Sequence, residues 1–383
     1  QIYFECWRQM RDFFYDPGMH GVNWEKLRDQ YAELLPYVNT RIDLAYIIGE
    51  LIGELNCGHA YVGGGDYVKA DRIPMGLLGG TLSKDKSGYF RIDKIYKSQN
   101  WDKNVRAPLT EIGVDAKEGD YILAVNGVST KNVSNIYSML IGKANKQITL
   151  KLNSAASETG AREVTVIPIA DEQKLIYYTW VQNNIEKVNK ATGGRVGYLH
   201  IPNMGPEGLN EFAKYFYAQL YKEGLIIDDR GNGGGNVSPM IIERLKREPV
   251  QVTKARNAAP VFEPADQVIG PKVALIDEYS ASDGDIFAYR FQKSKLGPVI
   301  GKRSWGGVVG IRGTLPIVDG GILNRPEFSR YDVEGKRWEI EGHGVDPDIV
   351  VDNDPAKEFM GEDQQLNEAI RYIMDQMKNK QFK

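Results

Sequence analysis

Ser282 stands where a predicted strand gives way to a predicted helix. The run from Lys272 to Ile276 is apolar, small residues follow it, and an apolar-periodic helix begins at Ile286. A serine on such a turn exposes its hydroxyl, and the N–H groups of a helix N-terminus favour negative charge. Acyl transfer needs this geometry, a nucleophile beside donors for an oxyanion. The competing interpretation is that Ser282 caps the helix, because serine is a preferred N-cap residue.

A glycine-rich loop follows another apolar strand-like segment, in the run Asp228-Asp-Arg-Gly-Asn-Gly-Gly-Gly-Asn236. Consecutive glycines let backbone N–H groups approach a ligand with no Cβ in the way. The loop lacks the P-loop lysine and the Gly-x-Gly-x-x-Gly spacing, so oxyanion binding fits better than nucleotide binding. We expect the N–H groups of Asp283 and of Gly234 or Gly235 to form an oxyanion hole. A flexible turn is the alternative.

Two further segments offer partners for a serine nucleophile. His59 lies in Asn56-Cys-Gly-His-Ala-Tyr-Val62, at a predicted helix-to-strand junction among small residues. Glu341 and His343 lie in a loop shaped by glycines and Pro347. A histidine base oriented by a carboxylate completes a Ser–His–acid arrangement. A purely structural histidine is the alternative for position 59.

Composition excludes several classes of protein. The chain has 383 residues, which predicts two or three domains, and its net charge is −3. Mixed acids and bases argue against nucleic acid or an anionic membrane as a partner. No apolar run reaches the roughly 18 residues of a membrane span. Two cysteines, Cys6 and Cys57, make neither a disulfide framework nor a zinc site, so we expect no metal and no cofactor.

The elements that must position these residues fall into successive regions. Helical spacing dominates at the N-terminus, short strands with turns follow, and strand-like and helix-like runs alternate from residue 194. This alternation favours α/β layering with a mostly parallel sheet. We therefore predict a multidomain α/β and β protein. Its parts are a helical domain at 1–65, a β-rich domain at 66–155, a connecting segment with a helix at 156–193 and an α/β core at 194–383.

The β-rich domain resembles a PDZ domain. A Gly119-Asp120 turn, a strand from Tyr121 to Val125 and an Asn126-Gly127 hairpin turn occur in the expected order. The resemblance implies strand addition of an extended peptide and capture of its terminal carboxylate on backbone N–H groups. The candidate capture loop consists of Gly76, Leu77, Leu78 and Gly79. Alternatively, its glycines only shape the entry to a strand.

Four motifs in order resemble the C-terminal processing peptidases and their relatives, the tricorn proteases. They are Asp-x-Arg-x-Asn-x-Gly-Gly at 228–235, Ser-Ala-Ser-Asp at 280–283, Gly-Lys-Arg-Ser-Trp-Gly-Gly at 301–307 and Gly-Val-Asp-Pro-Asp at 344–348. The order of helical segment, PDZ domain and α/β core matches as well, over nearly the whole chain. The resemblance implies a ClpP/crotonase-like core and a serine peptidase that acts on peptides or unfolded polypeptides.

The resemblance also implies residue roles. The tricorn branch takes its base from a histidine ahead of the PDZ domain and orients it with a glutamate before the Gly-Val-x-Pro-Asp run. Those positions are His59 and Glu341 in this chain. The nucleophile is Ser282. The branch has a serine before the histidine where this chain has Gly58, so Glu341 contacts His59 directly, or Asn56 or a water links them.

Two alternatives stay open. The processing peptidases use a lysine at the position of Gly307, so a Ser–Lys enzyme here would need Lys295 or Lys302. A catalytically impaired, PDZ-containing peptide-binding protein is the other alternative, favoured by Gly58. The resemblance further implies homo-oligomeric assembly and β-propeller domains ahead of this region, consistent with a first residue, Gln1, that is not Met. It implies a cytoplasmic location as in archaeal relatives, or a periplasmic or exported one in bacteria.

Overall fold

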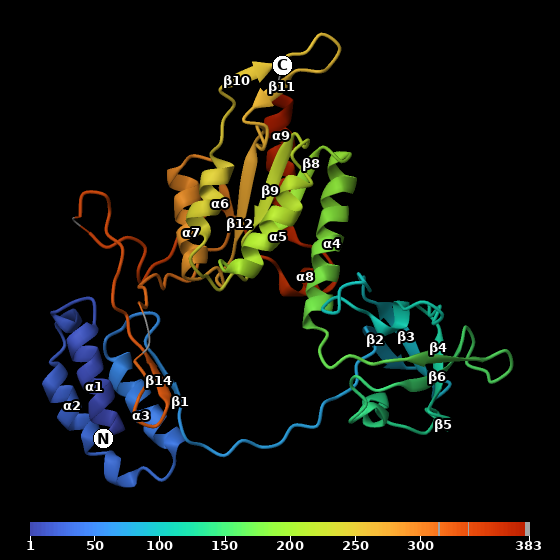
Figure 1. Cartoon of the computed structure of the whole chain (residues 1–383), viewed down its shortest axis with the longest axis horizontal. Helices are drawn as coiled ribbons and strands as arrows, with labels where there is room; N and C mark the ends of the chain where they lie inside the picture. The colour runs from blue at the N-terminus through green and yellow to red at the C-terminus, as the bar shows by residue number, and fades with distance from the viewer. Residues whose placement is uncertain (313–314, 336, 380–383) are drawn as a thin grey trace. The chain divides into compact units, whose positions relative to one another are not determined.

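The computed structural model describes residues 1–312, 315–335 and 337–379, which form two compact units (Figure 1). The first unit combines Gln1–Val68 with Lys187–Lys383, and the second is Lys69–Glu186. The boundary falls within helix α4 (Gln173–Thr192), the connecting helix expected from the sequence.

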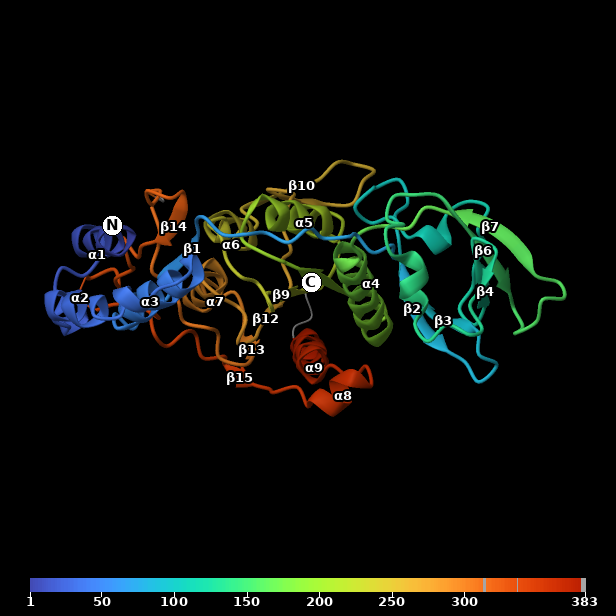
Figure 2. The same cartoon turned by 90° about the horizontal axis from the view of Figure 1, so that it is seen from below.

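A parallel sheet forms the centre of the α/β part of the first unit. Its order is β15 (Ile349–Val350), β13 (Val299–Gly301), β12 (Lys272–Ile276), β9 (Gly224–Asp228) and β8 (Val196–His200). Helices α5 (Pro206–Tyr217) and α6 (Ser238–Leu245) cover one face, and α9 (Gln364–Asn379) packs on β9 and β12 from the other (Figures 1 and 2). Both faces are covered, which explains why strands β8, β9 and β12 are buried at every residue.

Three helices and a two-stranded ribbon make the N-terminal part of the same unit. They are α1 (Ile2–Phe13), α2 (Trp24–Ala32), α3 (Arg41–Gly53), and the strands β1 (Tyr61–Gly64) and β14 (Gly321–Asn324). The indole N–H groups of Trp7 and Trp24 each donate to the other residue's carbonyl oxygen, at 2.9 and 3.1 Å. A capping box between Thr40 and Asp43 starts α3. Position 59 therefore lies between the end of α3 and β1.

The second unit is built on an antiparallel sheet in the order β2 (Gly80–Lys84), β3 (Phe90–Ile95), β4 (Tyr121–Val125), β6 (Ile148–Asn153) and β7 (Arg162–Val166), with β5 (Val128–Ser129) on β4. Asn126 and Gly127 have positive φ, as a two-residue hairpin turn requires. Two features differ from expectation. The sequence predicts a short helix from Val133 to Ile141, and the structure has a 3₁₀-helix there, η4 (Ile136–Leu140). The sequence also predicts that a strand from Gln147 to Leu152 closes the unit, but the sheet continues past β6 into β7, which follows a polar, turn-rich segment.

The remaining elements are short or peripheral, apart from α7 (Asp283–Lys293), which follows β12. They are η1 (Met19–Gly21), η2 (Leu35–Tyr37), η3 (Pro108–Thr110), β10 (Gln251–Thr253), β11 (Val261–Glu263) and α8 (Pro355–Phe359). In the described ranges no helix is both long and apolar enough to cross a membrane. Cys6 and Cys57 are free thiols.

Candidate active site

Ser282 occupies the N-cap position of α7, immediately after the loop from β12. Its φ of 56° and ψ of −115° are unusual for a residue with a side chain. Its side chain makes no capping hydrogen bond, so the interpretation that its hydroxyl serves to cap the helix is wrong. Backbone strain of this kind costs about 1–3 kcal/mol and concentrates at functional sites. The strained backbone instead places Ser282 directly before the first turn of α7.

The glycine loop packs directly against this turn. A Cβ added to Gly234 would lie 2.5 Å from the Ser282 Cβ and 2.9 Å from the backbone nitrogen of Asp283. The N–H of Gly234 donates to the side-chain oxygen of Asn232 at 2.9 Å. Among the described residues no acceptor is found for the N–H groups of Asp283 or Gly235. Two backbone donors thus remain unengaged beside a loop that approaches the serine closely.

His59 lies in a second strained turn, with φ of 61°. Its half-buried ring packs edge-on against Trp305, with centroids 5.7 Å apart. The Nδ1 atom is buried and has no hydrogen-bond partner among the described residues. Burial lowers the pKa of His59 below 6.5, the charge of Glu341 raises it, and Arg330 lowers it further. At neutral pH the ring is therefore in the form that can accept a proton.

The other three histidines are engaged elsewhere. The partners of their rings include the Leu55 carbonyl for His20, the Arg230 carbonyl for His200 and the Asp346 carboxylate for His343. His343, which the sequence placed in the same loop as Glu341, is an exposed surface residue. Within the described part of the chain, His59 is the one histidine whose ring packs against Trp305.

The carboxylate of Glu341 binds backbone N–H groups from two segments. One oxygen accepts from Gly58 at 3.2 Å, and the other accepts from Val308 and Val309 at 2.6 and 2.9 Å. Neither this carboxylate nor the side chain of Asn56 hydrogen-bonds the His59 ring in the described part of the chain. Glu341 therefore acts on the imidazole through its charge and through the backbone next to it.

One loop, residues 304–309, joins the surroundings of the serine to those of the histidine. The Trp305 N–H donates to the Ser280 carbonyl at 3.0 Å, and the Gly306 N–H donates to the Asp285 carboxylate at 2.8 Å. The ring of Trp305 contacts His59, and the end of the loop binds Glu341. The sequence motif contained Trp305, but nothing in it indicated this bridging position.

Asp285 lies one turn into α7 and is fully buried. Burial raises its pKa to about 6, although hydrogen bonds from Ser304 and from the backbone of Gly306 and Ser282 favour the charged form. Its position three residues after the N-cap is that of a capping-box acid. Asp285 therefore connects the strained serine turn to the 304–309 loop, a role that the sequence did not reveal.

The lysines of the Ser–Lys alternative do not suit a general base. Lys295 is exposed and lies beyond the far end of α7, about 17 Å along a helix from its start. Lys302 forms ion pairs with Glu278 and Asp352, and these raise its pKa. A lysine base needs a lowered pKa, so this geometry opposes the alternative.

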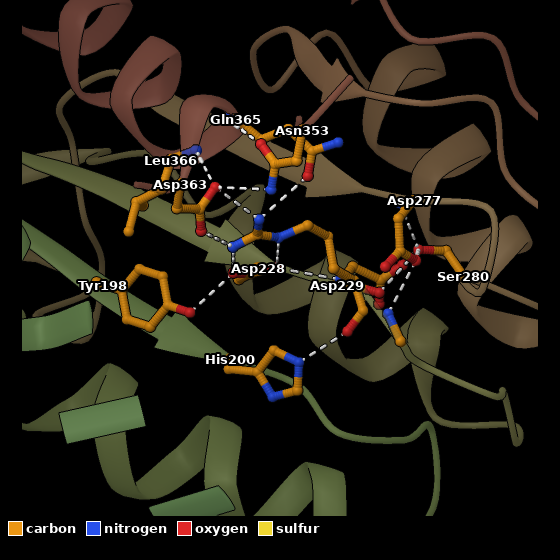
Figure 3. Close-up of polar contacts among 12 residues, drawn as sticks. Tyr198, His200, Asp228, Asp229, Asp277, Ser280, Asn353, Asp363, Gln365 and Leu366 are labelled. Atoms are coloured by element: carbon orange, nitrogen blue, oxygen red, sulfur yellow. Dashed lines mark hydrogen bonds and ion pairs between the residues drawn. The ribbon is translucent and has the colours of Figure 1, made fainter. Parts of the chain in front are cut away.

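A buried polar network supports the start of the glycine loop (Figure 3). The Arg230 guanidinium binds the Asp228 carboxylate at 2.6 and 2.9 Å, and it contacts Asp363 and Gln365 at the start of α9. Tyr198 donates to Asp228 at 2.8 Å. The Asp-x-Arg motif pointed to these residues without indicating that they are structural.

The predicted capture loop of the second unit has partly engaged N–H groups. Gly76 donates to the Leu140 carbonyl at 2.9 Å, and Leu77 donates to the Ile169 carbonyl at 2.8 Å. Gly79 donates instead to the Glu172 carboxylate at 2.6 Å. Two of the four residues thus use their N–H groups to build the domain.

Within the described ranges, no group of three or more His, Cys, Asp or Glu side chains is arranged to hold a metal ion.

Comparisons with known proteins agree with this architecture. The chain matches the sequence models of peptidase family S41 over residues 195–351, of the tricorn protease PDZ domain over 76–171 and of the tricorn protease C1 domain over 1–53. It is 38% identical to Tricorn protease homolog 1 of Streptomyces coelicolor, over 97% of this chain and 34% of that protein. It is 33% identical to the Tricorn protease of Thermoplasma volcanium, over 98% of this chain and 36% of that protein.

A solved structure shows the same similarity to tricorn proteases. The crystal structure of the tricorn protease superposes with a TM-score of 0.92 at 33% identity, covering 99% of this chain and 37% of that chain. An S41 core together with a PDZ domain defines the class as serine peptidase. The chain belongs to the tricorn protease family. It spans about a third of the length of these curated relatives, and the comparisons give no support to catalytic impairment.

Proposed function

We propose that this chain hydrolyses peptide bonds through an acyl-enzyme on Ser282. The Ser282 oxygen bonds to the peptide carbonyl carbon while its proton moves to His59. The carbon–nitrogen bond then breaks, and His59 returns that proton to the leaving amine. Water then attacks the ester carbonyl carbon while its proton moves to His59, the bond from that carbon to the Ser282 oxygen breaks, and His59 returns the proton to the serine oxygen. Glu341 stabilises the imidazolium that forms in each half of the cycle.

The oxyanion is held by the Asp283 N–H and a second N–H from the glycine loop. Gly235 is the better second donor, because the Gly234 N–H is already engaged by Asn232. The role of Gly234 is then to let the loop approach Ser282 closely. One such donor typically contributes about 3 kcal/mol to lowering the barrier.

One observation carries the proposal. Ser282 is held at positive φ at the start of α7, with the backbone of Gly234 packed on its Cβ. A structural serine would have no need of this strain or of unengaged N–H groups beside it. The lowered pKa of His59 supports its role as the base.

The proposed substrates are peptides or unfolded polypeptides, which the second unit binds by strand addition to β2. Gly76 to Gly79 lead into that strand. Homo-oligomeric assembly is part of the proposal and rests on family resemblance alone. Sedimentation velocity of the purified chain would test it, and a monomer at micromolar concentration would argue against self-assembly of this region.

The central test is covalent labelling of the whole chain by a fluorophosphonate probe, together with cleavage of short fluorogenic peptides. Ser282→Ala should abolish both. Ser294→Ala, at the opposite end of α7, should change neither. Labelling that persists in Ser282→Ala would show that another residue is the nucleophile. A wild-type chain that is folded yet neither labels nor cleaves would instead favour a peptide-binding protein.

A further inference from the structure

A carboxylate of the chain itself occupies the predicted carboxylate-capture loop. The Gly79 N–H donates to the Glu172 side chain at 2.6 Å, and the Gly80 N–H also stabilises the charged form of this side chain. Burial nevertheless raises the pKa of Glu172 overall. Adjacent backbone N–H groups that converge on one carboxylate are how PDZ domains hold a peptide terminus. The contact therefore shows that this loop is built to bind a carboxylate.

Glu172 is placed there by the start of α4. Its carbonyl accepts the first helical hydrogen bond, from the Ile176 N–H at 2.8 Å, so it stands at the N-cap position. Asp171 binds the N–H of Gln173 at 2.8 Å and leaves the Glu172 side chain free to reach the loop. The Lys97 N–H donates to Thr179 and anchors the first half of the helix to the same unit. These contacts fix the backbone of Glu172 at the start of α4 and leave its side chain as the part that can move.

The surroundings fit an extended chain that ends at this point. Strand β2 starts at Gly80 and is the edge strand of its sheet, so one row of its backbone groups is available for strand addition. Burial raises the pKa values of Tyr96 and Tyr137, and the nearby charge of Glu172 raises them further. An added strand would reach the loop with its last residue, where Glu172 now sits.

We propose that Glu172 is a built-in competitor for the peptide terminus, so that the second unit binds a free C-terminal carboxylate only when this side chain moves aside. The inference rests on the peptide-binding part of the proposed function and is independent of the chemistry at Ser282. The affinity for a peptide is then reduced by the fraction of time the loop is open. Removing the competitor should restore that affinity.

The test measures fluorescence anisotropy of a labelled hexapeptide with a free, apolar C-terminal residue, using the whole chain carrying Ser282→Ala to prevent cleavage. Glu172→Gln removes the charge with the same side-chain shape, and Glu172→Asp withdraws the carboxylate by one methylene. Both should bind the free-acid peptide about tenfold more tightly. The same peptide with a C-terminal amide should bind the variants and the wild-type sequence with equal affinity.

Glu163→Gln is the matched control, because it removes one exposed carboxylate from β7 of the same unit. This substitution should leave the affinity for both peptides unchanged. Thermal unfolding of each variant confirms that the domain is intact. The proposal is overturned if folded Glu172 variants bind the free acid no better than the wild-type sequence does, or if the acid and amide peptides gain equally. Neither outcome would bear on labelling of Ser282.

Discussion

The carboxylate of Glu341 accepts a hydrogen bond from the backbone N–H of Gly58, the residue directly before His59. The resemblance to the tricorn branch implies a serine at this position. Here the glutamate reaches the backbone of the preceding residue and leaves the buried Nδ1 of the histidine without a partner among the described residues. In the proposed mechanism, the contact by which Glu341 orients His59 is therefore electrostatic.

Restoring the hydroxyl should strengthen this contact. Gly58→Ser places an oxygen between Glu341 and His59, and we expect kcat to rise about three- to tenfold, as one added hydrogen bond allows. The new Cβ would lie 3.0 Å from the Gly307 Cα, so the 304–309 loop must shift by a few tenths of an ångström. Gly58→Ala has the same Cβ without the hydroxyl. A kcat for the serine variant no higher than that of the alanine variant would contradict the relay.

Removing the charge of Glu341 should have two effects on the pH–rate profile. Glu341→Gln should lower kcat by about 10²- to 10⁴-fold, because the imidazolium loses its stabilising charge. Since that charge raises the pKa of His59, its loss should also move the acid limb of kcat/KM to lower pH. Steady-state kinetics between pH 4.5 and 8 would show both. The exposed Glu334→Gln should change neither, and an unmoved acid limb would remove Glu341 from this role.

The glycine loop should tolerate a methyl group at one position and not at another. Gly234→Ala sets a Cβ against the Ser282 Cβ and the Asp283 nitrogen, at a φ of +97°, and should reduce acylation by at least about 100-fold. Gly233→Ala has open space around its Cβ and should stay within about threefold of wild type. Rates of fluorophosphonate labelling measure this directly. Equal rates for the two variants would show that close packing on the serine is unimportant.

Asp285 should make the protein less stable as the pH rises. Its folded-state pKa of about 6 lies above the ordinary 3.8, so the native state binds more protons than the unfolded state between these values. Its contribution to stability therefore falls from about pH 4 to about pH 6, by up to about 3 kcal/mol. Asp285→Asn should flatten this slope in urea unfolding at pH 4.5 and 7.5, whereas the exposed Asp266→Asn should not. An unchanged slope would mean that Asp285 is already ionised at low pH.

The pattern of the sequence was enough to place the strands of the core and the turn that carries Ser282. Strand β12 begins at Lys272 and ends at Ile276, as the apolar run predicts, because burial on both faces of the sheet leaves that run uninterrupted. What periodicity could not supply were contacts made by single side chains across long distances in the chain. The contacts of Trp305 with Ser280 and His59, and of Glu172 with the capture loop, depend on tertiary packing that local spacing does not indicate.

The 3₁₀ type of the short helix, and the existence of strand β7, were not predicted for a related reason. Five residues give too little repeat to separate a 3₁₀-helix from an α-helix. In strand β7 only Val164 and Val166 are buried, so the alternation of buried and exposed residues is short. The segment forms a strand because it pairs with β6. Pairing rather than local propensity decides such segments.

Arg230 binds Asp363 and Gln365 at the start of α9, so this helix helps to hold the glycine loop in place. Asp363 and Gln365 hold one side of a guanidinium whose other side holds Asp228, at the root of the glycine loop. Removing one partner of a buried ion pair typically lowers the free energy of unfolding by about 3–5 kcal/mol. Cleavage of the chain ahead of α9 would therefore weaken the anchor of the glycine loop without changing Ser282, His59 or Glu341.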